Sequence, residues 1–304
     1  MRIEKRKYKM NQTQLERKRT GKGFIAALDQ SGGSTPKTLA AYGVSEQEYH
    51  NEAEMFAQVQ QMRARIMTSP AFSGEYILGA ILFAKTLEET VDGLPAADYL
   101  WERKQIVPFL KVDVGLAEEE NGVQLMKANP ELLALLEKAR AKNIFGTKMR
   151  SLIKAANPVG IAKAVEQQFI LAKTILAQGL MPIVEPEVAI EISDKLAAEK
   201  ILKEEIQKRL DELAPGEQVM LKLSLPSENN FYADVIADPR VLRVVALSGG
   251  YPQVEANEKL LLNQGMIASF SRALLENLTA QQTAAEFDQT LGNSVKAIYT
   301  ASVH

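Results

Sequence analysis

The chain repeats one pattern, a short apolar run followed by a longer segment with helical periodicity, and no linker or low-complexity segment interrupts it. Such alternation predicts a parallel sheet, because parallel strands need a crossover connection that is usually a helix. The predicted strands are Phe24–Asp29, Tyr76–Phe83, Val107–Val112, Ile144–Met149, Leu180–Glu185, Val219–Ser224, Leu242–Leu247 and Met266–Phe270.

Eight predicted strands favour closure into a (β/α)₈ barrel. An open, doubly wound sheet is the alternative, but the turn after the first strand reads DQSGGS and lacks the G-x-G-x-x-G spacing of dinucleotide-binding folds. We therefore predict an α/β fold, a (β/α)₈ TIM barrel in a single domain. The expected domain covers residues 12–304 and includes a C-terminal helical segment, and residues 1–11 are expected to form a flexible basic tail.

Several element boundaries can also be predicted. The spacing of apolar residues in Glu52–Met67 predicts a helix. Ser193 is a candidate N-cap for the helix that follows it, and Thr279 with Gln282 has the spacing of a capping box. Pro186 is expected to end the fifth strand, because proline has no backbone N–H to donate.

Composition excludes several classes of function. The net charge of −2 over 304 residues gives no general attraction to nucleic acid or to an anionic membrane, and no apolar run is long enough to span a bilayer. The absence of cysteine excludes disulfides and thiolate chemistry, and neither His50 nor His304 has metal-ligand spacing. We expect a cytoplasmic protein that needs no metal and no organic cofactor and has no nucleic-acid or membrane partner.

Lys222 lies in the middle of an apolar strand, VMLKLSLP. Val219, Leu221 and Leu223 share one face of this strand, and Lys222 lies on the other face. A lysine in a core strand is either a structural residue paired with a carboxylate or a desolvated, reactive amine. The strand alone leaves both interpretations open.

Polar and charged residues follow most of the other predicted strands. Barrel enzymes carry their chemistry at the carboxyl ends of the strands, and residues two apart share a face, so these side chains are expected to converge. They form either an ion-pair network that fills the end of the barrel or an active site. The residues are Asp29, Lys111, Asp113, Lys148, Arg150, Glu185, Glu187, Lys222, Ser248, Gly249, Gly250 and Arg272.

The lysines and carboxylates in this set suggest amine chemistry. Burial and a neighbouring cation such as Lys148 both favour the neutral form of Lys222. A neutral amine can attack a ketone and form a Schiff base, which withdraws electrons from the adjacent carbon. This route to a carbanion requires neither a metal nor an organic cofactor.

Two segments are candidate anion sites. Ser248, Gly249 and Gly250 form a turn whose backbone N–H groups can approach an anion, and Arg272 follows the last predicted strand. Ser31, Ser34 and Lys37, after the first strand, form a second candidate. The alternative there is a helix N-cap beside a solvated lysine.

Seven segments together resemble one known family, the class I fructose-bisphosphate aldolases, and are most similar to the short bacterial form. They are GKGFIAALDQSGGSTPKTL, FLKVDVGL, GTKMRSLI, MPIVEPEV, VMLKLSLP, VVALSGGYPQVEAN and ASFSRALLENL. They occur in the family's order, and the resemblance covers residues 12–290.

The resemblance implies a barrel that reversibly cleaves fructose 1,6-bisphosphate to dihydroxyacetone phosphate and glyceraldehyde 3-phosphate. At matching positions it implies that Lys222 is the Schiff-base nucleophile and that Glu187, with Glu185 beside it, is the general acid/base. Lys148 matches the cation near the nucleophile, and Asp29 matches the carboxylate that assists carbon–carbon cleavage. The phosphate on the ketone side would contact Ser248, Gly249 and Arg272, and the other phosphate Ser31, Ser34, Lys37, Lys111 and Arg150.

The chain departs from the animal members of the family at three places, one of which is that residues 1–9 have no counterpart in them. Gln30 stands where they have an acidic residue, and Tyr299 cannot be matched to their C-terminal tyrosine. The partners implied are small sugar phosphates, and the family often forms homo-oligomers. The alternatives are another Schiff-base aldolase, acting on tagatose bisphosphate or a monophosphate, and a non-catalytic barrel that binds sugar phosphates.

Overall fold

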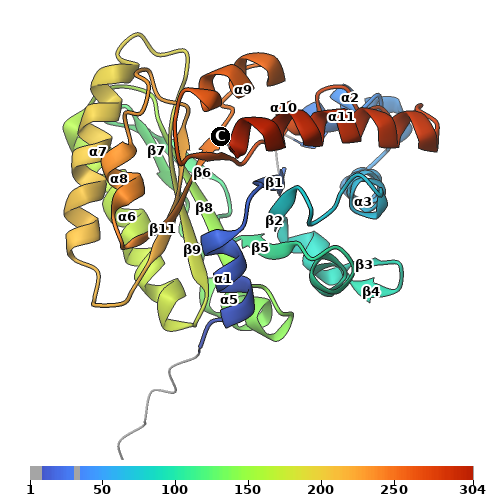
Figure 1. Ribbon diagram of the computed structural model, residues 1–304, viewed down its shortest axis with the longest axis horizontal. Coiled ribbons are helices and arrows are strands. Elements are labelled where there is room, and N and C mark those ends of the chain that lie inside the picture. Colours follow the sequence, from blue (N-terminus) through green and yellow to red (C-terminus); the bar gives the residue numbers. More distant parts are fainter. Residues whose placement is uncertain (1–8, 31–34, 304) are drawn as a thin grey trace, which may run out of the picture.

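The computed structural model describes residues 9–30 and 35–303. Eight parallel strands follow one another around a nearly closed barrel (Figure 1). All eight predicted strands are present, and the predicted barrel is confirmed. In the order of the sheet they are β1 (Phe24–Leu28), β2 (Ile77–Leu82), β5 (Val107–Lys111), β8 (Gly146–Ile153), β9 (Met181–Val188), β10 (Val219–Ser224), β11 (Val241–Leu247) and β12 (Ile267–Ala268).

The barrel closes between its last and first strands. The backbone N–H of Ala27 in β1 donates to the carbonyl of Phe270, just after β12, at 3.1 Å. In β12 itself, the N–H of Ala268 donates to the hydroxyl of Ser302 near the C-terminus, at 3.0 Å. Strand β1 therefore bonds to the backbone just after β12, and β12 itself bonds to a side chain near the C-terminus.

Alternation along the strands creates two apolar layers. Residues of the outer face, such as Leu221 and Leu223 in β10, pack under the helices. Residues of the inner face fill the barrel, among them Phe109 of β5, Ile183 of β9 and Met220 of β10. Because successive side chains of a strand point to opposite faces, the residue two positions after an interior residue also points inward.

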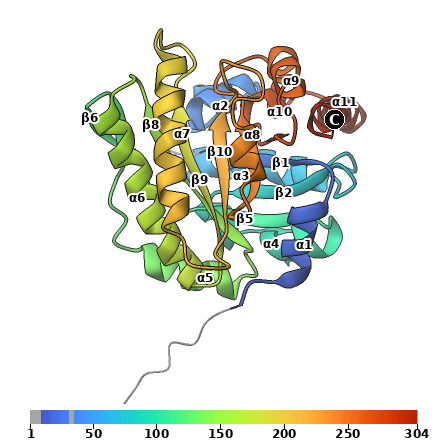
Figure 2. The same ribbon diagram turned by 60° about the vertical axis from the view of Figure 1, so that its left-hand side comes forward.

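Helices and two small strand pairs surround the barrel. Helices α6 and α7 lie outside β8, β9 and β10 (Figure 2). The helices are α1 (Gln12–Thr20), α2 (Thr35–Ala41), α3 (Glu52–Thr68), α4 (Ala96–Asp98), α5 (Leu132–Ala141), α6 (Pro158–Ala177), α7 (Lys195–Asp211), α8 (Ala233–Ala237), α9 (Gln253–Leu261), α10 (Arg272–Leu275) and α11 (Ala284–Ser302). The small strands are β3 (Thr90–Val91), β4 (Leu94–Pro95), β6 (Leu116–Glu120) and β7 (Val123–Met126).

The expected end of the fifth strand at Pro186 is wrong, because β9 continues to Val188. The N–H of Met181 donates to the carbonyl of Phe145, and the N–H of Ala189 donates to that of Ile153. The backbone N–H groups of the odd-numbered residues of β9 therefore point towards β8. Alternation therefore turns Pro182 and Pro186 towards β10. The missing donors are lost on that side only, and β9 stays paired with β8 through Val188.

The helix over Glu52–Met67 is confirmed, but two predicted helix starts are wrong. Helix α7 begins after Asp194 rather than after Ser193, and the Asp194 carboxylate accepts from the N–H of Ala156 at 2.7 Å. Helix α11 begins after Thr283, which forms the capping box with Glu286. Gln282 instead accepts from the N–H of Thr279 and closes a turn before the helix.

No helix in the described part of the chain combines the length and apolar character needed to cross a bilayer.

Candidate active site

The charged residues of the site extend the inner face of the strands. In β1 the interior residues Ile25 and Ala27 are followed at the same spacing by Asp29, just beyond the strand. In β10 the interior residue Met220 is followed by Lys222. The same spacing places Lys111, Lys148 and Glu185 at the carboxyl end of the barrel, where they line a cavity of about 790 Å³. The convergence predicted from the strand ends is therefore present.

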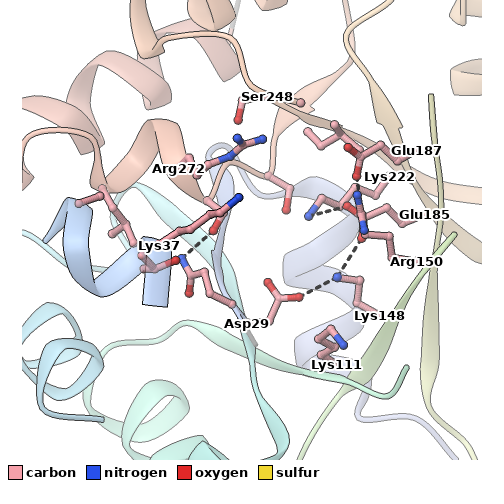
Figure 3. Close-up of a pocket in the computed structure, with 18 of the residues that line it drawn as sticks. Asp29, Lys37, Lys111, Lys148, Arg150, Glu185, Glu187, Lys222, Ser248 and Arg272 are labelled. Carbon is pink, nitrogen blue, oxygen red and sulfur yellow. Dashed lines mark hydrogen bonds and ion pairs between the residues drawn. The ribbon is translucent and has the colours of Figure 1, made fainter. Parts of the chain in front are cut away.

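Lys222 belongs to a buried chain of charges. Its Nζ lies 3.0 Å from Glu185 Oε1, and Lys148 Nζ lies 2.9 Å from the other oxygen of the same carboxylate. Lys148 Nζ also lies 2.7 Å from Asp29 Oδ2. Figure 3 shows the resulting order Lys222, Glu185, Lys148, Asp29. No more than 8% of any of these side chains is exposed.

Two lysines and two acidic side chains alternate in this cluster. Burial alone would raise the pKa of Asp29, but the charges of Lys148 and Lys222 lower it to about 2. Burial also opposes ionisation of Glu185, and the same two lysines bring its pKa below the usual value. For Lys148, the pull of Asp29 and Glu185 outweighs burial and raises the pKa. Asp29, Glu185 and Lys148 are therefore charged at neutral pH.

Glu187 does not join this chain of charges. Its Oε2 accepts a hydrogen bond from Arg150 Nε at 2.5 Å, on the neighbouring strand β8. Both residues line the cavity. The contact between Lys222 and a carboxylate thus involves Glu185, although the sequence resemblance assigned the acid/base role to Glu187.

Lys111 also has a carboxylate partner. Its Nζ contacts Asp113 Oδ1 at 2.5 Å and the carbonyl of the same residue at 2.7 Å. Lys111 and Arg150, both expected to bind a phosphate, are therefore held by acidic residues in this structure.

The turn after β11 has the backbone expected of an anion site. Gly249 and Gly250 have φ of +63° and +130°, values that side chains rarely tolerate. A Cβ on Gly249 would lie 2.6 Å from Ile190 Cγ2, so the chain is also too close to its neighbour for a side chain. Ser248 is buried beside the cavity, and Arg272 extends towards it from the start of α10 (Figure 3).

Lys37 lies in α2, which forms part of the cavity wall. In Figure 3 it is drawn on the side of Arg272, across the cavity from Lys111 and Arg150. Lys37 and Arg272 have no ion-pair partner among residues 9–30 and 35–303. Ser31 and Ser34, the other residues expected near this anion, lie outside the described residues.

Three further residues lie in or beside the site and were not predicted as site residues. Gln30 Nε2 donates to Ser271 Oγ at 2.7 Å, which links the segment after β1 to the segment after β12. The buried Arg63 of α3 donates to the carbonyl of Gln30 at 2.5 Å and to Thr86. A charged residue on the otherwise apolar face of Glu52–Thr68 was the available signal for Arg63. Nothing in the sequence indicated Ser271.

Among the described residues, no group of three or more histidines and acidic residues is arranged to hold a metal ion.

Comparison with known proteins gives a consistent result. A model of the glycolytic, class I fructose-bisphosphate aldolases matches residues 10–229. A protein of Clostridium acetobutylicum named fructose-bisphosphate aldolase class 1 is 59% identical over 97% of this chain and 100% of its own length. A protein of the same name from Synechocystis sp. is also 59% identical, over 96% of this chain and 98% of its own.

The fold is similar to that of a solved structure of fructose-bisphosphate aldolase from Plasmodium falciparum. The TM-score is 0.74, the identity is 19%, and the match covers 99% of this chain and 98% of that one.

Proposed function

The chain belongs to the class I fructose-bisphosphate aldolases, which reversibly cleave fructose 1,6-bisphosphate to dihydroxyacetone phosphate and glyceraldehyde 3-phosphate, and we propose that Lys222 is the amine that does this chemistry. One observation carries the proposal. Lys222 is buried in the wall of the cavity, and its Nζ lies 3.0 Å from a carboxylate that can take its proton.

Glu185 is the acid/base in this proposal, because it and not Glu187 contacts Lys222. Glu185 takes a proton from the ammonium group, and the freed lone pair attacks the ketone carbon of the substrate. A carbon–nitrogen bond forms, and one proton moves from nitrogen to the former carbonyl oxygen. Glu185 then returns its proton to this hydroxyl, which leaves as water, and a protonated imine remains on Lys222.

Asp29 completes the cleavage. It accepts the proton of the C4 hydroxyl while the C3–C4 bond breaks, and the bonding electrons move onto C3 and into the protonated imine. This step releases the aldehyde and leaves an enamine on Lys222. The pKa of about 2 means that Asp29 is ionised at neutral pH, so its carboxylate can accept the proton.

Each phosphate is assigned to one side of the cavity. The turn of Ser248, Gly249 and Gly250 binds the phosphate next to the ketone, together with Arg272, whose charge has no acidic partner among the described residues. Lys37 lies on the same side and adds to this positive charge. Lys111 and Arg150 bind the other phosphate, which must compete with Asp113 and Glu187 for them.

Reductive trapping tests the nucleophile. Borohydride added with dihydroxyacetone phosphate should reduce the imine to a stable amine, and peptide mass mapping should place the adduct on Lys222. Activity should survive a metal chelator, because the proposed steps use protein groups only.

The Lys222→Met variant should form no adduct, and Lys18→Met, which removes another buried lysine, should form it normally. An adduct on any other lysine of the wild-type protein would overturn the assignment.

We further propose a cytoplasmic location, a homo-oligomeric assembly and no nucleic-acid partner, with residues 12–304 acting as one domain. The glycolytic role of the family supports the cytoplasmic location, and the net charge of −2 supports the absence of a nucleic-acid partner. Light scattering of the purified protein tests the assembly.

A further inference from the structure

Strand β10, which carries Lys222, is held unequally by its two neighbours. It pairs with β11 along its whole length, from Val219 to Ser224. Its pairing with β9 is confined to two adjacent positions, Met220 with Ile183 and Leu221 with Val184. Beyond Leu221 the ladder between β9 and β10 stops.

The two prolines of β9 explain the short ladder. Pro182 and Pro186 both face β10, as the alternation of the strand requires, and neither has an N–H to donate. The ladder therefore lacks donors on either side of Ile183 and Val184. The same strand stays in register with β8 along its full length, although the N–H of Glu185 donates to Gln168 of α6 at 2.8 Å. The loss of paired positions is therefore confined to the β10 side.

Ser224 joins the two strands again beyond this gap. Its hydroxyl donates to the carbonyl of Val188 at 2.7 Å and accepts from the N–H of the same residue at 3.0 Å. The side chain is buried, and it lies on the same face of β10 as Lys222. One hydroxyl thus satisfies both backbone groups that Val188 turns towards β10.

Lys222 and Glu185 both lie inside the gap. On β10, Lys222 lies between the last ladder pair and Ser224, and on β9, Glu185 lies between the same pair and Val188. Backbone pairing on one side and Ser224 on the other therefore fix how far apart the two strands are at these residues. The ion pair of 3.0 Å between Lys222 and Glu185 spans this distance.

We propose that Ser224 is a positioning residue, which keeps Glu185 within proton-transfer distance of Lys222. The proposal rests on the proposed function, since it assumes that this proton transfer is a step of the reaction. A displacement of about 1 Å between reacting groups can lower a rate roughly 100-fold.

Other contacts fix the chain after β10 without joining it to β9. Lys195 of α7 donates to the carbonyl of Leu225 at 2.8 Å, and Glu199 of α7 accepts from the N–H of Ser227 at 3.0 Å. Variants at Ser224 therefore keep the anchors of β10 to β11 and α7. We expect them to fold.

The test compares Ser224→Thr with Ser224→Val, which have nearly the same shape and differ in the hydroxyl. The rate of borohydride-trapped adduct formation on Lys222 with dihydroxyacetone phosphate is measured in both variants and in the wild type. The valine variant should be slower than the threonine variant by about 10-fold to 100-fold. The KM for fructose 1,6-bisphosphate should differ less than threefold between them, because the proposed phosphate contacts do not involve Ser224.

Equal rates in the two variants, with the adduct on Lys222, would overturn the role of Ser224 and leave the nucleophile intact. An adduct on another lysine in the wild type would overturn the assignment of Lys222 as the nucleophile, on which this proposal rests. If neither variant folds, Ser224→Ala is compared with the wild type, with the rate expressed per folded molecule by circular dichroism. A rate per folded molecule equal to that of the wild type would then reduce Ser224 to a structural residue.

Discussion

Lys148 holds together two carboxylates that would otherwise repel each other. Asp29 and Glu185 both contact its ammonium group, and all three side chains are buried. Lys148 supplies a positive charge that lies against both carboxylates. Removing it leaves two buried carboxylates with Lys222 as the nearest cation, an arrangement that raises carboxylate pKa values.

We expect Lys148→Met to shift the acidic limb of the pH profile of kcat/KM to higher pH. The pKa of Asp29 is about 2 in the wild type because lysine charges outweigh burial. The variant loses Lys148, the lysine whose charge lowers this pKa most. Protonated Asp29 cannot accept the C4 hydroxyl proton, so activity is lost at a higher pH as the pKa rises. The rate at neutral pH should fall roughly 100-fold or more.

The control is Lys148→Arg, which keeps the charge and should move the acidic limb less than the methionine variant. An unchanged acidic limb in Lys148→Met would mean that Lys148 does not set the charge of Asp29 during turnover.

At the scale of elements, the sequence predicts strands and their inward-facing residues well, because a period of two and the strand-end rule are local properties. Lys148, Glu185 and Lys222 could be brought to one cavity on these grounds alone. Their partners could not, since whether Glu185 or Glu187 reaches Lys222 depends on the register of β9 against β10. The predicted end of β9 is also wrong, because the donor that Pro186 lacks would point towards β10, and pairing with β8 continues to Val188.

Helix α7 contains a buried ion pair whose loss should destabilise the fold. Lys195 contacts Glu199 one turn later, and Glu199 is completely buried. Lys195→Met leaves this carboxylate without its cation, so we expect the free energy of unfolding to fall by about 3–5 kcal/mol. Urea denaturation monitored by circular dichroism measures the change.

The double variant Lys195→Met with Glu199→Gln separates charge from packing. It removes the uncompensated charge but keeps an acceptor for the N–H of Ser227. We expect it to recover more than half of the lost stability. A double variant as unstable as Lys195→Met would show that packing, and not the unpaired charge, causes the loss.

At the scale of the whole molecule, most charged side chains are paired at one end of the barrel, whereas the other end contains a buried lysine without a hydrogen-bond partner in the described part of the chain. Within residues 9–30 and 35–303, the carboxyl end collects lysines and carboxylates that pair with one another, apart from Lys37. At the opposite end α1 covers the barrel, where Leu15 packs against the inner apolar layer and Arg243 of β11 donates to the carbonyls of Lys18 and Arg19 at 2.9 and 2.8 Å. Lys18 is fully buried here, and its Nζ has no hydrogen-bond partner among the described residues.

Burial lowers the pKa of Lys18 well below its usual value, and the charges of Arg243 and Arg17 act in the same direction. The Phe109 ring, whose centroid lies 5.3 Å from Nζ, attracts the ammonium group too weakly to offset this lowering of the pKa. An amine whose pKa is lower in the folded state opposes folding most at low pH, where both states bind the proton. Its cost falls as the pH rises from the folded pKa towards the ordinary value of 10.5, because there the unfolded state binds more protons.

We therefore expect Lys18→Met to raise the free energy of unfolding at neutral pH by about 1 kcal/mol or more, because methionine fills the same space without a polar group to desolvate. The advantage over the wild type should shrink as the pH approaches 10.5. Urea denaturation at several pH values measures both effects, and Lys22→Met, at an exposed lysine just after α1, is the control that should show neither. A Lys18→Met protein that is less stable than the wild type at every pH would show that the amine contributes an attractive contact at the base of the barrel.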